Sequence, residues 1–440
     1  MLWRKIRRFW KNGSVNRNRV YKKVLVCSIT AIVFCISSCS NAFSQKDNRE
    51  ELCGEDAKEA VSNENRKNEE KKAAEEIEKG YNLPVRDKER KEAKEDCKNV
   101  MERIFDLYKQ ADKGLASNTV ISDETIDKMV EKVKETGYPV TATKVYTNME
   151  NYKKMERFLK DCKNGKKGTM ILYELHSDGG IGRNKYTFDG TDLYVLSAIA
   201  IWNENNEPKM TEVSYTRIKK WKYTKRGWFG YELCVPEPPE VSEMVDGSIL
   251  IRVKPMDEQC REMAKKCVQE IGYQGNNLLC TNWDREHMEK LDYNCLYESL
   301  YSMKYQKEFS DEQASNGIPQ KDFEKLVMEY LPVTAGQIRN YAAFDADSQT
   351  YDWKKTGCFH YIPTYLGTAV PEVVDIRENK DGTVTLTVDA VCDMVVCDEA
   401  MITHELTVRF AEDGSFKYLG NKILDGRENI PEYQYRFDRK

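Results

Sequence analysis

The stretch Thr383-Val-Thr-Leu-Thr-Val-Asp-Ala-Val391 indicates the fold class of the second half of the chain. Apolar residues occupy every second position from Val384 to Val388, and threonine or aspartate occupies the positions between them. Because successive side chains of a strand point to opposite faces, this alternation predicts a half-buried β-strand. The turn sequences Lys380-Asp-Gly382 and Glu412-Asp-Gly414 bracket this run and the next one, which favours an antiparallel hairpin.

Helices followed by strands are expected twice along the chain. Apolar residues three and four positions apart predict helices between residues 90 and 162, and alternating runs separated by turn residues predict strands between 169 and 235. A second helical block is expected between 256 and 341, followed by strands between 370 and 423. This order indicates an α+β fold class with two modules, each made of helices followed by an antiparallel sheet. By analogy, order and size resemble cystatin-like and NTF2-like folds, in which a curved sheet cradles a helix.

The chain before the first module has almost no apolar residues. Lys, Glu, Asn and Ala dominate residues 39–94. A segment of this composition cannot bury a core, and its Glu and Lys residues favour solvated helix or coil. We interpret it as a charged helical or disordered stalk.

The N-terminus has the pattern of an export signal. Nine Lys and Arg residues and no acid precede the apolar run Val24–Ile36, which ends in Ile36-Ser-Ser-Cys39. That ending resembles the lipobox of bacterial lipoproteins, and the resemblance implies that Cys39 carries a diacylglycerol after the signal is cut before it. Two alternatives remain open: an uncleaved signal anchor, or cleavage after Ala42. All three export the rest of the chain, and the lipoprotein interpretation places it on the extracellular face of the cell membrane, anchored by its lipid.

These observations divide the chain into five expected segments. In order, they are a lipoprotein signal peptide (1–38), the charged stalk (39–94), a first α+β module (95–245), a second α+β module (246–425) and a C-terminal tail (426–440).

The composition argues against a nucleic-acid-binding protein. The formal net charge of the 440 residues is −4, and acids and bases are interspersed through the body of the chain. A nucleic-acid-binding domain would instead carry a basic face. The basic residues at the N-terminus belong to the signal and form no such face.

The fourteen cysteines allow two interpretations. Excluding Cys27 and Cys35 in the signal and Cys39 as the lipid site leaves 14 − 3 = 11, an odd number that cannot all pair. Either an exported chain forms disulfides, or the thiols are small buried apolar residues. Cys392 and Cys397 lie between two expected strands and are candidates for a disulfide. Together with Cys358 and His360 they could also ligate zinc, but this is less favoured, because two cysteines between paired strands more simply form a disulfide or stay apart as small residues.

A row of tyrosines is the strongest candidate for a binding site. Tyr293, Tyr297, Tyr301 and Tyr305 recur every fourth residue on one expected helix. Successive members lie about 40° apart around the helix axis, so the row winds slowly along one side. The rings either flank the core with their hydroxyl groups in water or form an aromatic platform for sugars, peptides or a partner helix.

No catalytic or metal-binding motif is recognisable. His404-Glu405 lacks the second histidine of a zinc protease, and the two side chains point to opposite faces of an expected strand. Cys358 and His360 lack a third group that would orient them as nucleophile and base. No cofactor or metal site is therefore expected.

Four stretches in the second half carry a resemblance to a known family: Gly272-Tyr-Gln-Gly-Asn-Asn-Leu-Leu-Cys280, Val370-Pro-Glu-Val-Val374, Thr383-Val-Thr-Leu-Thr-Val-Asp-Ala-Val-Cys-Asp-Met394 and Ile402-Thr-His-Glu-Leu-Thr-Val-Arg-Phe410. From about Met256 to Ile423 the chain resembles an uncharacterised family of exported lipoproteins, a domain of unknown function, from clostridial-type Gram-positive bacteria. The resemblance implies export and carries no activity.

The leading hypothesis is a membrane-anchored surface lipoprotein that acts by binding. The expected partners are the membrane, through the lipid anchor, and an envelope polymer, an extracellular ligand or another surface protein. The alternative is an envelope-acting hydrolase with an unrecognised active site.

Overall fold

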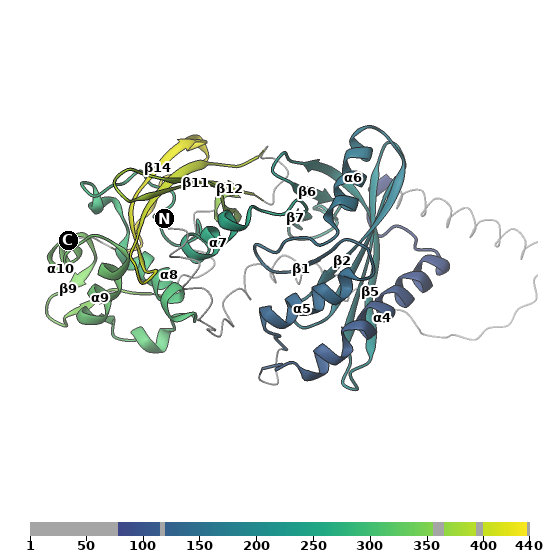
Figure 1. Cartoon of the computed structure of the whole chain (residues 1–440), viewed down its shortest axis with the longest axis horizontal. Coiled ribbons are helices and arrows are strands. Elements are labelled where there is room, and N and C mark those ends of the chain that lie inside the picture. The colour runs from purple at the N-terminus through teal and green to yellow at the C-terminus, as the bar shows by residue number, and fades with distance from the viewer. Residues whose placement is uncertain (1–77, 115–118, 355–364, 393–398, 438–440) are drawn as a thin grey trace, which may run out of the picture. The chain divides into compact units, whose positions relative to one another are not determined.

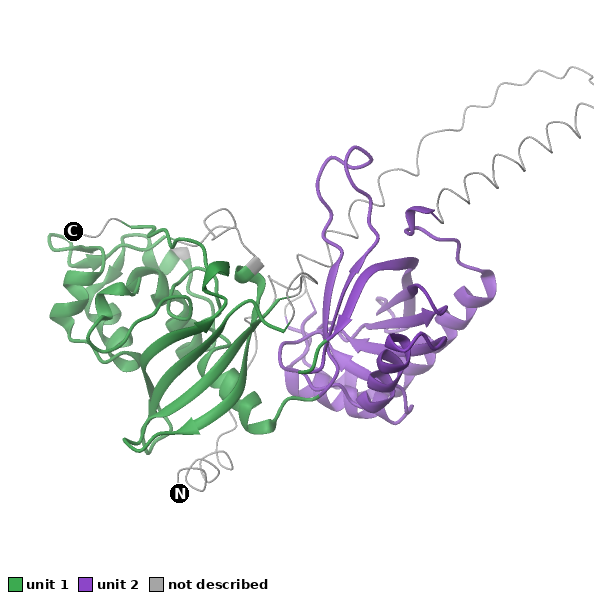
Figure 2. Ribbon diagram, turned by 90° about the horizontal axis from the view of Figure 1, so that it is seen from above, with its two compact units in different colours: residues 1–20, 224–226, 255–440 green, residues 21–223, 227–254 purple. Residues whose placement is uncertain are grey.

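The computed structural model describes residues 78–114, 119–354, 365–392 and 399–437. These residues form two compact units (Figure 2). Within them, unit 2 holds residues 78–223 and 227–254, and unit 1 holds residues 224–226 and 255–437. Both contain helices and antiparallel strands, so the predicted α+β class is confirmed.

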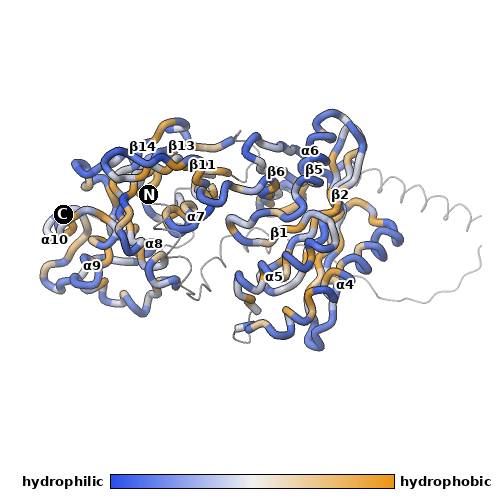
Figure 3. Tube along the Cα trace, viewed as in Figure 1, coloured by the Kyte–Doolittle hydropathy of each residue, from blue (hydrophilic) through white to orange (hydrophobic). Residues whose placement is uncertain are grey.

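Unit 2 is built on one seven-stranded sheet whose strands follow sequence order (Figure 1). The strands are β1 (Val140–Ala142), β2 (Gly168–Leu175), β3 (Ile181–Phe188), β4 (Leu193–Trp202), β5 (Pro208–Tyr223), β6 (Trp228–Leu233) and β7 (Ser248–Arg252). β1 pairs in parallel with β2, and every later neighbouring pair is antiparallel. Figure 3 shows apolar residues concentrated along these strands.

Three helices of unit 2 cover the two faces of this sheet. They are α4 (Asp87–Gln110), α5 (Asp123–Lys134) and α6 (Tyr152–Lys163). α4 and α5 bury their predicted apolar faces against one face of the sheet, beside Tyr173 and Leu196. α6 packs on the other face, beside Leu172. Ser122 caps α5, because its hydroxyl oxygen accepts a hydrogen bond from the N–H of Thr125.

We call the face under α6 the inner face, because the sheet curls towards it. The hydroxyl groups of Tyr186 on β3 and Tyr231 on β6 lie 3.2 Å apart, although two strands separate them in the sheet. The ring of Tyr186 also meets that of Phe229 on β6 edge-on, with 5.6 Å between centroids. Register shifts in the β4–β5 and β5–β6 pairs accompany the curl, as β-bulges do.

A buried cation holds α4 on the opposite, outer face. Arg183 on β3 is 1% exposed, and its guanidinium donates hydrogen bonds to Asp96 at 2.8 Å and to Glu92 at 3.1 Å. A buried arginine is stable only with such partners. The two carboxylates of α4 therefore place the helix over β3.

Two predicted boundaries are corrected. Residues 80–94 were assigned to the stalk but lie in unit 2, where buried Leu83 donates its N–H to the carbonyl of Tyr215 at 2.9 Å. β7 was assigned to the second module but pairs with β6 in unit 2. A single strand does not reveal from its own sequence which sheet it joins. The predicted signal peptide and residues 39–77 lie outside the described residues.

Unit 1 contains a four-stranded antiparallel sheet, one small three-stranded sheet and four α-helices among its described residues. The large sheet orders β11 (Val370–Glu378), β12 (Val384–Val391), β13 (Thr403–Phe410) and β14 (Phe416–Asp425). The small sheet orders β8 (Ile318–Pro319), β10 (Thr350–Tyr351) and β9 (Phe344–Asp345). The helices are α7 (Glu258–Cys267), α8 (Tyr293–Tyr305), α9 (Gln320–Tyr330) and α10 (Ala335–Tyr341). The large sheet and its turns were predicted, whereas the small sheet was not.

β12 forms as predicted but is buried on both faces rather than one. Thr385 and Asp389, expected to face water, are 5% and 2% exposed. Neighbouring side chains satisfy them: the amide of Asn379 donates to the Thr385 hydroxyl at 2.9 Å, and the Thr403 hydroxyl donates to Asp389 at 2.8 Å. The alternation therefore predicted the strand correctly and its exposed face wrongly, because threonine and aspartate can be buried when hydrogen-bonded.

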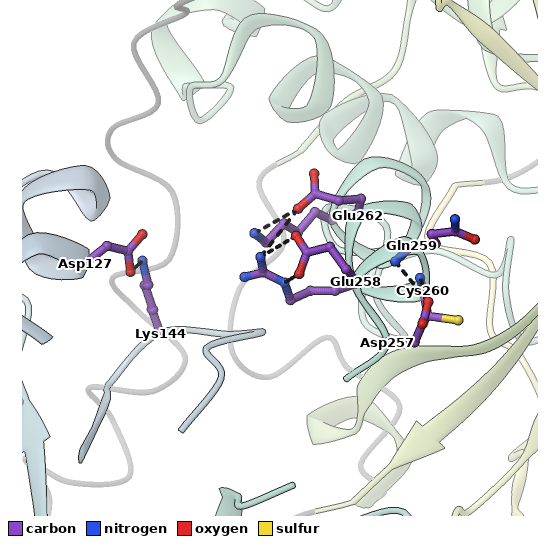
Figure 4. Close-up of polar contacts among 9 residues, drawn as sticks. Asp127, Lys144, Asp257, Glu258, Gln259, Cys260 and Glu262 are labelled. Carbon is purple, nitrogen blue, oxygen red and sulfur yellow. Dashed lines mark hydrogen bonds and ion pairs between the residues drawn. The ribbon is translucent and has the colours of Figure 1, made fainter. Parts of the chain in front are cut away.

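The helices of unit 1 begin at capping residues. Figure 4 shows Asp257 before α7, where its carboxylate accepts hydrogen bonds from the N–H groups of Gln259 at 2.9 Å and Cys260 at 3.1 Å. Thr334 and Gln337 form a capping box at α10. Caps of this kind are each worth about 1 kcal/mol.

Candidate functional site

The four tyrosines predicted as a platform all lie on α8, and the row runs from the core of unit 1 to its surface. Asp292 begins the helix by accepting a hydrogen bond from the N–H of Cys295 at 3.1 Å. Gln306 ends it with a left-handed backbone, at a φ of 54°. The four-residue spacing of the tyrosines therefore predicted the helix correctly. The exposure of each ring decides whether it packs in the core or can contact a ligand.

Tyr293 and Tyr297 belong to the core. Tyr293 is fully buried, and its hydroxyl donates to the carbonyl of Met288 at 2.9 Å. Tyr297 is 3% exposed and stacks on Phe323 of α9, with ring centroids 4.9 Å apart. Burial raises the pKa of Tyr297. These two rings pack against other elements rather than against solvent.

Tyr301 and Tyr305 form the outer end of the row. Their ring centroids lie 4.5 Å apart, and Tyr305 is 46% exposed. The Tyr301 hydroxyl accepts a hydrogen bond from the side-chain amide of Gln313 at 2.8 Å. Buried Phe309 lies behind Tyr301, with centroids 4.9 Å apart. Lys304, which pairs with Glu329, lies over the ring of Tyr305 at 5.5 Å.

Trp353 extends this group. Its ring meets Phe309 edge-on, with 4.8 Å between centroids. Among the described residues, its indole N–H is buried without a hydrogen-bond acceptor. Buried donors in proteins are nearly always hydrogen-bonded, so this N–H group is available to an acceptor supplied by a ligand. We name Tyr301, Tyr305, Phe309 and Trp353 the aromatic patch.

The described thiols are buried. Seven free cysteines are buried: Cys97, Cys162, Cys234, Cys260, Cys267, Cys280 and Cys295. Burial raises the pKa of Cys97, Cys267 and Cys280 to about 12. A thiol with such a pKa stays protonated at neutral pH and is a poor nucleophile. For these seven residues, the interpretation as small buried side chains is confirmed.

The other cysteine predictions stay open. Cys392 is 2% exposed, but Cys397, its predicted disulfide partner, lies outside the described residues. The predicted lipidation site Cys39 and the pair Cys358 and His360 also lie outside them.

His404 has a structural environment. It is fully buried on β13, where one ring nitrogen lies 2.9 Å from the Tyr273 hydroxyl and the other 2.6 Å from the side-chain oxygen of Asn421. Desolvation lowers the pKa of His404 to about 4. The amide of Asn421 in turn donates to the carbonyls of Leu279 and Thr281. This network joins the 272–283 loop to the sheet and leaves no ring nitrogen for substrate.

A second group of polar side chains, on the inner face of unit 2, was missed in the sequence. Glu174 follows Leu172 at the next alternate position of β2, His176 comes directly after the strand ends at Leu175, and Gly182 on β3 is the register partner of Glu174. A Cβ atom on Gly182 would lie only 3.1 Å from Nε2 of His176, so this glycine makes room for the imidazole. Gly182 lies within β3, which begins at Ile181.

Glu174 is the unusual member of this group. Desolvation raises the pKa of its carboxyl group, and the charge of His176 opposes that shift. The residue is nevertheless only partly buried, so the carboxyl is recessed rather than sealed from solvent. A titratable pair at alternate positions of the sequence, in line with apolar Met170 and Leu172, was the available sequence signal. This signal did not predict a site, because the sequence does not show which element covers the inner face of the sheet.

Two further features are absent from the described residues. No group of three or more His, Cys, Asp or Glu residues in them is arranged to hold a metal ion. Of the helices in that part of the chain, none is long and apolar enough to cross a membrane.

Comparisons with known proteins identify the family alone. Neither the curated proteins nor the solved structures include a match. The model of a family of unknown function, DUF6070, matches residues 90–436. This range is wider than the resemblance expected from about Met256 to Ile423, because it covers most of unit 2 as well. The chain therefore belongs to the family of unknown function DUF6070.

Proposed function

We propose that the protein is a surface lipoprotein of a Gram-positive bacterium that binds an envelope polymer through the aromatic patch of unit 1. In this proposal Cys39 anchors the chain to the membrane, the charged stalk lifts two α+β modules from it, and no covalent chemistry is required. Another surface protein or a small extracellular ligand is the other class of partner.

The observation that carries the proposal is the pair of neighbouring rings at the end of α8, of which Tyr301 is partly buried and Tyr305 is exposed. Tyr305 is among the few large apolar side chains of the described residues that are exposed, and Tyr301 and Phe309 support it from behind. An aromatic face of this kind suits a sugar ring or an apolar side chain, while the hydroxyl groups remain available for hydrogen bonds. The buried thiols and the buried His404 support binding over nucleophilic catalysis.

Sedimentation of the full chain with purified Gram-positive peptidoglycan tests the proposal. We expect the wild-type protein to co-sediment, and Tyr305→Ala to weaken binding about tenfold, the effect of removing one aromatic hot spot. Tyr138→Ala is the matched control, because Tyr138 is 42% exposed but lies in unit 2.

Equal binding by the Tyr305→Ala and Tyr138→Ala variants would exclude the aromatic patch as the site. Release of soluble sugar or peptide fragments by the wild-type protein would instead favour the hydrolase alternative.

A further inference from the structure

The inner face of the unit 2 sheet has a covered end and an uncovered end. Under α6 most inner-facing residues are buried, as for Leu172 at 0%, Tyr186 at 0% and Leu193 at 1% exposure. Further along the same strands, six inner-facing side chains are only partly buried. The residues concerned are Glu174, Asn184, Ser197, Ile199, Glu212 and Ser214. Both ends belong to one sheet, so the difference comes from the extent of α6.

The uncovered end is polar and hydrogen-bonds across neighbouring strands. Asn184, Ser197 and Ser214 are register partners on β3, β4 and β5. The Ser197 hydroxyl donates to the side-chain oxygen of Asn184 at 2.8 Å. Among the described residues, the amide nitrogen of Asn184 has no acceptor, so two donor hydrogens remain for a ligand.

The carboxylates at this end form no ion pair within the described chain. Glu174 makes no hydrogen bond or ion pair with any described residue, although it is partly desolvated. Glu212 lies on the same row of the inner face, across Gly182 and Ile199. The nearby cations Arg183 and Lys185 occupy the outer face, where they pair with carboxylates of α4.

Two basic side chains also lie on the inner face, but neither forms an ion pair with the carboxylate of Glu174 in the described residues. His176 lies beside Glu174, at the end of β2. Lys209 is exposed at the start of β5, opposite Ile201, one row beyond Glu212. A carboxylate that has lost part of its hydration without gaining a partner favours a cation that binds beside it.

We propose that the uncovered end of the inner face binds a hydroxylated primary amine, of the amino-sugar class, with the ammonium group on Glu174 and the hydroxyl groups on Asn184 and Ser197. The curl of the sheet contributes to this site, because Tyr186 and Tyr231 meet across the inner face and close its far side. The site lies wholly in unit 2, so it stands or falls independently of the aromatic patch in unit 1.

Calorimetric titration of the full chain tests this site with two probes that differ only in the acetylation of their amino groups, and therefore in charge. The glucosamine disaccharide carries free ammonium groups, and the N-acetylglucosamine disaccharide does not. We expect the wild-type protein to bind the glucosamine disaccharide about tenfold more tightly or better, because a charge-assisted hydrogen bond to Glu174 is lost with the acetylated probe.

Three variants separate the contributions. Glu174→Gln keeps the shape of the side chain and should abolish the preference for the ammonium probe. Glu204→Gln is the matched control, since Glu204 is exposed in the turn before β5 and should leave the preference unchanged. Ser197→Ala should weaken both disaccharides to the same extent, because the hydroxyl contacts are common to them.

Each outcome decides the proposal. Equal affinity of the wild-type protein for both disaccharides, absence of binding by either, or an unchanged preference in a folded Glu174→Gln variant would overturn it. Loss of the preference in Glu174→Gln alone, with melting temperatures matching or exceeding the wild-type value, would establish the site.

Discussion

At the scale of single residues, His404 is held as a neutral imidazole between Tyr273 and Asn421. Its pKa is lowered to about 4 in the folded protein, against about 6.5 in an unfolded chain. The unfolded state therefore binds a proton between these two values while the folded state does not. Stability is full above the unfolded pKa and is lost as the pH falls through this window, by about 3 kcal/mol at pH 4.

Denaturant unfolding as a function of pH measures this loss. His404→Gln cannot titrate, so the difference in unfolding free energy between variant and wild type should shrink as the pH falls from neutral towards 4. His287→Gln is the control, because His287 is exposed and pairs only locally with Asp284. A wild-type profile parallel to that of His404→Gln would show that the imidazole is not buried in its neutral form.

Glu174 has the opposite linkage. Its folded pKa lies above its ordinary value, so the folded state favours the protonated carboxyl and is destabilised once the pH rises through that pKa. Glu174→Gln should therefore melt at a higher temperature than the wild type at neutral pH, and at the same temperature in acid, below both pKa values. A melting temperature for the variant that is lower at neutral pH would mean that the carboxylate has a stabilising partner.

At the scale of elements, α8 carries both core and surface aromatic residues. Tyr297→Ala removes a ring that is packed between Phe309 and Phe323, and should cost about 3 kcal/mol of unfolding free energy. Tyr305→Ala removes an exposed ring and should cost less than about 0.5 kcal/mol. Chemical denaturation of both variants measures the difference. Comparable losses would show that the two rings do not differ in packing.

The same helix shows what the sequence can and cannot predict. Four-residue spacing predicted α8, and apolar spacing predicted α4 and α5, because helical periodicity is local. Which tyrosines are buried depends on Phe309 and Phe323, and these contacts are long-range. The two-residue strands of the small sheet in unit 1 are too short to show any alternation. The sequence shows that residue 174 is a glutamate. It does not show that this glutamate lacks an ion-pair partner, because that depends on long-range contacts.

At the scale of the whole molecule, the proposed lipidation of Cys39 would determine where the protein acts. Acyl chains stabilise a membrane anchor by about 0.8 kcal/mol per buried CH₂, so one modified thiol is enough to change the location of the chain. In a Gram-positive host fed an alkyne-bearing fatty acid, the wild-type protein should be labelled and should fractionate with the membrane. Cys39→Ala should lose the label, whereas Cys53→Ala, which changes the next cysteine along the chain, should keep it.

The mature N-terminus then separates the three interpretations of the signal. Lipidation with cleavage before Cys39 gives a blocked or acylated cysteine as the first residue. Cleavage after Ala42 gives a chain that begins at Phe43, carries no label and leaves the membrane. An uncleaved anchor keeps the basic N-terminal segment, and its Cys39→Ala variant remains in the membrane fraction because the apolar run itself holds it there. Peptide mass mapping of the membrane and soluble fractions therefore decides whether both units are displayed on a lipid tether, which the proposed binding to the envelope requires.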